Sequence, residues 1–173
     1  MNSLLPTSVH DFDQAGVFAV PQLFDDFECD QMRREASVLA SSTLISPRNL
    51  RTETWLRLGE RVLSKFDPVA DVSGLFAEVA SDSRVVRYAQ EALGATPTLF
   101  KDKLVCKLPG HPGFGPHQDN TWYRPFTERL VGMMIALDSC NYDTGALEVA
   151  LGKSLDRNAV PLGQIRDLRP DEC

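Results

Sequence analysis

The chain has 173 residues, of which 43% are hydrophobic and 24% are charged, and its net charge is −6. This is ordinary globular composition, which argues against disorder and low complexity. The acidic balance argues against a general binder of nucleic acid, because affinity for the phosphate backbone comes mostly from clustered Lys and Arg. A chain of this length buries roughly 70% of its unfolded surface, enough for a core without disulfides. We expect one domain, residues 1–173, with a small molecule as its substrate or ligand.

The four cysteines are widely spaced and form no C-x-x-C pair, which excludes a zinc knuckle and a dense disulfide framework. Reduced thiols are therefore expected, as in the cytoplasm. The N-terminus lacks the cationic and apolar regions of a signal peptide, and the longest apolar run, residues 130–137, is far too short to span a bilayer. We expect a cytoplasmic protein with neither a membrane nor a nucleic-acid partner.

Helical patterns dominate the first 97 residues. After a short strand predicted at residues 16–24, Asp25 or Asp26 is expected to cap a helix over residues 27–44, because apolar residues recur there at spacings of three and four. Residues 41–65 mix arginines with apolar residues around Pro47, and they are interpreted as an irregular segment or a lid. Two more helices are predicted at 69–80 and 83–93, the second ended by Gly94, and both are expected to pack on the outside of a sheet.

The character of the sequence changes to strands after Pro97. Strands are predicted at residues 98–108, 130–137 and 146–151, separated by a Pro/Gly-rich loop at 109–116 and a turn at 141–145. Residues 1–97 are thus expected to be mainly helical, and residues 98–173 to begin a β domain. No internal repeat and no linker divide the two parts.

The sequence His117-Gln118-Asp119 is the H-x-D spacing among the chain's three histidines. Residues i and i+2 of a strand share a face, so His117 and Asp119 would point inward together, within about 5 Å of each other. They would supply two thirds of the two-His, one-carboxylate triad that holds Fe(II) and leaves positions open for a cosubstrate and O₂. Such short motifs also arise by chance, and an exposed His in a polar turn is the alternative interpretation.

Several short motifs around this pair occur in the order and spacing of the phytanoyl-CoA dioxygenase family, which the chain resembles. They lie at residues 100–104, 107, 109–110, 116–119, 135–138, 144–149 and 152–154. The resemblance implies a double-stranded β-helix, a cupin-like jelly roll of the α+β or mainly β class with N-terminal helices. It also implies an Fe(II)- and 2-oxoglutarate-dependent dioxygenase that consumes O₂ and hydroxylates a small-molecule substrate.

The resemblance assigns roles to five residues. His117 and Asp119 would be the first two iron ligands and the catalytic centre. Lys103, Gln118 and Met134 fall where family members line the 2-oxoglutarate pocket. Lys103 could equally be a solvated strand lysine, and Met134 a core residue, which is the commoner role of Met.

The sequence departs from the family downstream of these motifs. The family has a second iron-binding His, followed by an Arg that pairs with 2-oxoglutarate, whereas no His follows His117 here, and Arg157, Arg166 and Arg169 lie too close to Ser154 for that position. We count about four strands of the eight that a jelly roll needs. We therefore expect the N-terminal portion of such an enzyme, completed by a missing C-terminal segment or by a second chain. The alternatives are a non-catalytic or truncated cupin-like binding module and, lower in rank, a zinc hydrolase.

Overall fold

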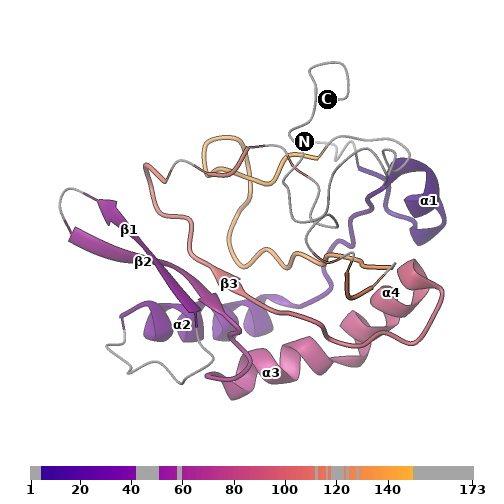
Figure 1. The fold of residues 1–173 in the computed structure, drawn as a ribbon, viewed down its shortest axis with the longest axis horizontal. Helices are drawn as coiled ribbons and strands as arrows, with labels where there is room; N and C mark the ends of the chain where they lie inside the picture. The colour runs from indigo at the N-terminus through magenta and orange to yellow at the C-terminus, as the bar shows by residue number, and fades with distance from the viewer. Residues whose placement is uncertain are drawn as a thin grey trace.

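The structure is a computed structural model, and it describes residues 5–41, 51–57, 60–111, 113–115, 117, 123, 125–127 and 129–149. For residues 51–57 and 60–64 the description covers the backbone alone. The elements along these residues are η1 (Val9–Asp11), α1 (Phe12–Ala15), α2 (Asp26–Ser41), β1 (Arg51–Arg57), β2 (Glu60–Asp67), α3 (Gly74–Ser81), α4 (Ser83–Leu93) and β3 (Leu104–Val105), as drawn in Figure 1.

Helices α2, α3 and α4 confirm the three helices predicted from apolar spacing. α2 begins with a capping box, in which the backbone N–H groups of Asp25 and Glu28 each donate to the carboxylate of the other at 2.8 Å. α4 ends at Gly94, whose φ of 65° is the left-handed conformation that favours glycine. α3 begins at Gly74 rather than at residue 69. The backbone N–H groups of Val69 and Ala70 donate instead to the Asp102 carboxylate, both at 2.8 Å, which holds this stretch as a turn.

The sheet has three antiparallel strands in the order β1-β2-β3. β1 and β2 form a hairpin with an irregularity between Glu53 and Thr54, and β3 pairs with the end of β2 through Lys65↔Val105 and Phe66↔Leu104. The interpretation of residues 41–65 as an irregular segment or lid is therefore wrong for 51–57 and 60–65. Thr, Trp and Val in these runs favour a pleated surface, and the partner strand lies only a short loop away.

Other predicted strands are shorter than expected or absent. Residues 16–24 form no strand, because Gly16 ends α1 at φ 75° and Gln22 has a φ of 55°. The strand expected at 98–108 is reduced to β3, and no strand is assigned within 130–137 or 146–149, whereas residues 150 and 151 lie outside the described part. A strand requires a hydrogen-bonded neighbour, and in the described residues only β2 offers one to this region. The described residues thus combine helices with one small sheet.

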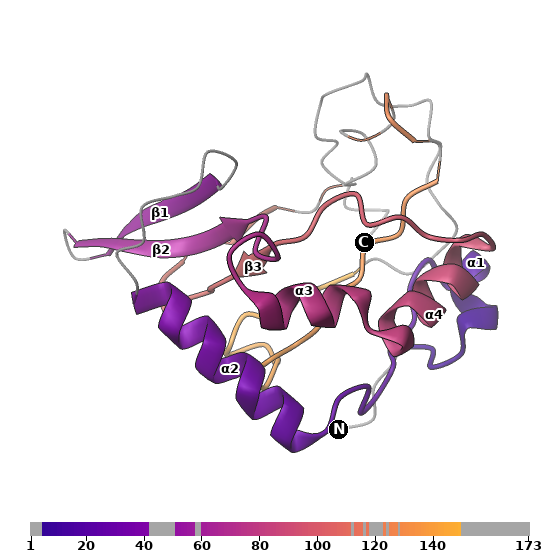
Figure 2. The ribbon, with the colours of Figure 1, turned by 90° about the horizontal axis from the view of Figure 1, so that it is seen from below.

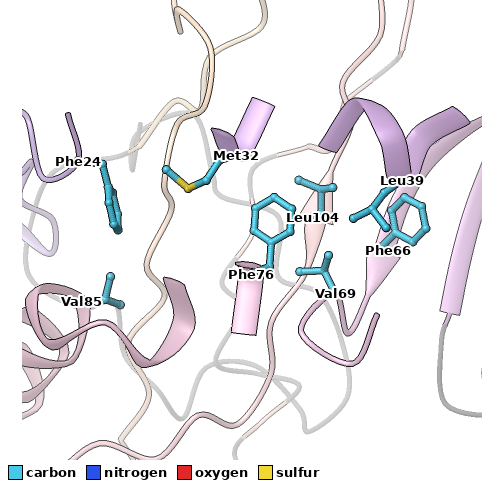
Figure 3. Packing of buried hydrophobic residues seen from close by; sticks show 8 residues of the cluster. All are labelled: Phe24, Met32, Leu39, Phe66, Val69, Phe76, Val85 and Leu104. Atoms are coloured by element: carbon cyan, nitrogen blue, oxygen red, sulfur yellow. The ribbon is translucent and has the colours of Figure 1, made fainter. Parts of the chain in front are cut away.

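The core lies between this sheet and helices α2, α3 and α4 (Figures 1 and 2). Its members, shown in Figure 3, are Phe24, Met32, Leu39, Phe66, Val69, Phe76, Val85 and Leu104. Phe76 of α3 and Val85 of α4 belong to the same core cluster as Leu104 of β3. These helices were expected to pack on a sheet formed after Pro97, but in the described residues that sheet is limited to β3, so this part of the prediction is not confirmed. Among the described residues, no helix is long and apolar enough to cross a membrane.

Candidate functional site

β3 and its flanking residues present two different faces. Leu104 is buried and Cys106 packs partly against the core, whereas Lys103 and Val105 are exposed. This alternation is that of an extended chain with one face covered. Burial raises the pKa of the Cys106 thiol, so that thiol stays neutral on the covered face. Lys103 is therefore exposed on the face that the helices leave open.

Residues 134–137 repeat this pattern although they form no ladder. Ile135 and Leu137 pack against the core, and Met134 is 60% exposed. Arg33 of α2 fixes the segment, because its guanidinium donates to the carbonyl of Leu137 at 2.7 Å. Met134 is therefore not part of the core cluster of the described residues. Met134 and Lys103 are alike in facing away from the helices.

His117 is exposed and lies in no strand, so the prediction that it points inward from a strand is not met in this structure. Its ring atom Nδ1 lies 2.7 Å from the carbonyl oxygen of Gly115. A carbonyl can only accept, so the proton of the neutral ring sits on Nδ1 and the lone pair on Nε2. Asp119 and Gln118 lie outside the described residues, and their positions stay predictions.

His111 has the opposite tautomer. The backbone N–H of Gly113 donates to His111 Nδ1 at 3.1 Å, so that atom carries a lone pair, and the proton of the neutral ring sits on Nε2. The lone pair of His111 is thus engaged by the backbone of its own loop. The two histidines, six residues apart, therefore differ in which ring nitrogen carries the lone pair.

A rigid turn follows the segment that carries Met134. Asn141 and Thr144 exchange hydrogen bonds, from each backbone N–H to the side chain of the other, at 2.9 and 3.0 Å. The Thr144 hydroxyl also donates to the carbonyl of Ser139. Lys107, two residues beyond β3, donates from Nζ to the carbonyl of Gly145 at 2.6 Å. The turn predicted at 141–145 is confirmed, and it lies against the chain that leads to His117.

Sequence reasoning missed one pair near the end of β2. Asp67 is buried, and Lys101 Nζ lies 2.8 Å from its carboxylate. The hydrogen bond to Asp67 raises the pKa of Lys101 despite partial burial. The aromatic ring of Tyr123 packs on that of Phe100, with centroids 5.4 Å apart. The available signal in the sequence was Asp67, which directly follows the apolar Phe66, because a carboxylate buried at such a position requires a partner.

Arg157, Arg166 and Arg169 also lie outside the described residues. Among the described residues, no group of three His, Cys, Asp or Glu side chains could hold a metal ion. Because Asp119 is not among them, the iron-ligand hypothesis is neither supported nor excluded by that finding.

Comparisons with known proteins agree on one family. The profile of the phytanoyl-CoA dioxygenase family matches residues 12–156. A 2-aminoethylphosphonate dioxygenase from an uncultured bacterium is 29% identical over 106 residues, which cover 61% of this chain and 40% of the relative. The dioxygenase lolE1 of Epichloe uncinata is 26% identical, covering 88% of this chain and 59% of the relative.

A third relative, the ectoine dioxygenase of Streptomyces avermitilis, is 28% identical over 82% of this chain and 48% of its own length. The chain thus spans between 40% and 59% of the length of these three curated relatives. No solved structure matches the chain significantly.

Proposed function

This chain belongs to the phytanoyl-CoA dioxygenase family, and we propose that it is the N-terminal portion of an Fe(II)- and 2-oxoglutarate-dependent dioxygenase that hydroxylates a small molecule. Beside the family match, the observation that carries the proposal is the distance of 2.7 Å between His117 Nδ1 and the Gly115 carbonyl oxygen, which an Nδ1–H donor accounts for. Metal-ligating histidines are oriented in this way, with the lone pair of Nε2 directed to the metal.

The iron ligands from this chain are His117 and Asp119. Imidazole and carboxylate are the donor types of the facial triad, so the residues fit the metal. His111 is less suited to complete the triad, because its Nδ1 lone pair already accepts from Gly113. When bound, iron and 2-oxoglutarate supply the oxidation of a substrate C–H bond by O₂, coupled to decarboxylation of the cosubstrate.

Lys103, Gln118 and Met134 are proposed to line the cosubstrate pocket. Lys103 and Met134 favour this assignment because both face away from the helix-packed core. An ammonium group on that face would bind a carboxylate of 2-oxoglutarate, and the Met side chain would exclude water from the cosubstrate.

The fold that we propose for the complete enzyme is the cupin-like jelly roll, in which the open face of these segments becomes the interior. Additional strands would come from a further segment of the protein or from a second chain. Exposed apolar side chains on the β half, among them Val105, Met134 and Leu147, are consistent with such a cover.

The substrate is proposed to be a small molecule, with neither nucleic acid nor membrane as a partner. The matched relatives are named for 2-aminoethylphosphonate and for ectoine, both small molecules. A cytoplasmic location agrees with the free thiols of Cys29, Cys106 and Cys140.

The test is an anaerobic titration of this chain with Co(II) as a spectroscopic probe, repeated with Fe(II) and 2-oxoglutarate. We expect weak binding that His117→Ala and Asp119→Ala each abolish, while His10→Ala leaves it unchanged. Little or no succinate should form in air, because two protein ligands hold the metal less firmly than three. Binding of equal strength in His117→Ala would refute the ligand assignment, and complete absence of metal binding would favour a non-catalytic binding module.

A further inference from the structure

Lys107 connects two segments that are distant in sequence. Its Nζ donates to the carbonyl of Gly145, 38 residues away, at 2.6 Å. The same Nζ lies 3.9 Å from the position that a Cβ of Gly113 would occupy. The side chain therefore lies between the turn at 141–145 and the loop that precedes His117.

The two glycines leave the space that this side chain fills. Gly113 and Gly145 have φ values of 74° and 72°, which favour glycine. A Cβ on Gly145 would lie 3.0 Å from both Cε and Nζ of Lys107, too close without a shift of the side chain. A Cβ at position 145 would thus push the end of the Lys107 side chain aside and disturb its bond to the carbonyl.

The turn and the loop are each held by their own short-range hydrogen bonds. The turn closes on itself through Asn141, Thr144 and the bond from Ala146 N–H to the Asn141 carbonyl at 2.9 Å. The loop is held by the bonds from His111 N–H to Leu108 and from Gly113 N–H to His111. In the described residues, the Lys107 side chain is bonded to the turn and extends alongside the Gly113 loop.

We propose that Lys107 is a positioning residue for His117. By holding the Gly113 loop against the 141–145 turn, it fixes the backbone that presents the Gly115 carbonyl to His117 Nδ1, and so it selects the tautomer with the lone pair on Nε2. The expected effect of Lys107 on metal affinity rests on the proposed function, whereas its expected effect on the His117 tautomer does not.

The primary experiment is ¹⁵N NMR of the histidine rings, which reads the tautomer without any metal. We expect His117 to carry its proton on Nδ1 in the native chain and to become a mixture of tautomers in Lys107→Met. Lys107→Arg, which retains a donor, should restore the native signal. His10, in η1 near the N-terminus, is the internal control and should not change.

A second variant removes the contact from the opposite side. Gly145→Ala should shift the His117 signals in the same direction as Lys107→Met, and the double variant should add little, because both changes break one interaction. Gly94→Ala is the matched control: its φ of 65° imposes a similar backbone strain, but a Cβ there would meet Arg129 at 3.9 Å and not Lys107. Circular dichroism checks that each variant is folded.

The metal readout is Co(II) affinity of the same variants. We expect Lys107→Met to weaken it by about tenfold, the lower end for residues that orient a metal ligand, because Lys107 is exposed to water. An unchanged His117 tautomer in folded Lys107→Met would overturn the inference. A shifted tautomer in a chain that binds no Co(II) would uphold the positioning role and refute the proposed metal site instead.

Discussion

Two adjacent residues of β3 test whether the sheet has one covered and one open face. Leu104 is 8% exposed and packs in the core, with Phe66 as its partner on β2, whereas Val105 is 48% exposed. Leu104→Ala removes a buried side chain and leaves a cavity, which should lower the free energy of unfolding by about 2–4 kcal/mol. Val105→Ala should cost less than about 1 kcal/mol, mostly through strand propensity.

Urea unfolding of both variants measures this difference, with equal m-values as the check that the unfolded states are comparable. In a chain of this size the expected loss for Leu104→Ala corresponds to a fall in Tm of about 4–16 °C. Equal losses for the two variants, or a larger loss for Val105→Ala, would refute the two-faced arrangement. The assignment of Lys103 to the open face would then fail with it.

Three further predictions concern contacts that hold the helices and the sheet. Hydrogen bonds from Arg84 hold the pKa of Asp82 at about 2 and lower the pKa of Glu28. The stabilisation that these bonds give the folded chain is present above the ordinary carboxyl pKa values of 3.8 and 4.5, and it is lost as the pH falls toward 2. In Arg84→Met the urea midpoint should fall less over that pH interval than it does in the native chain. The same dependence of the urea midpoint on pH in both chains would contradict this prediction. Asp67→Asn should lower the free energy of unfolding by about 1–3 kcal/mol, because Lys101 loses its buried partner. The control Asp71→Asn, at an exposed residue in the turn after β2, should lower it by almost nothing. Equal urea midpoints for the two variants would show that the Lys101–Asp67 pair contributes little. Met32→Ala should cost about 2–5 kcal/mol in thermal or urea unfolding because Met32 is 1% exposed, whereas Val38→Ala on the same helix, at 61% exposed, is the control that should leave stability nearly unchanged.

The family motifs and the helices could be predicted from the sequence because their determinants are local. Apolar spacing, the Asp25–Glu28 capping box and Gly94 specify helix limits within a few residues of the chain. The same holds for the turn at 141–145, whose bonds join residues three apart.

Tertiary structure decided the features that depend on partners far along the chain. Strand pairing made the hairpin of β1 and β2, and it limited β3 to Leu104–Val105 because β2 was its one neighbour among the described residues. Burial beneath the helices, rather than residue type, placed Leu104 inside and Met134 outside. The contact of Lys107 with Gly145 closes a loop of 38 residues, and no local pattern encodes it. Local secondary-structure propensity depends on residues that are neighbours in the sequence, whereas burial and hydrogen bonds between distant residues exist only in the folded chain.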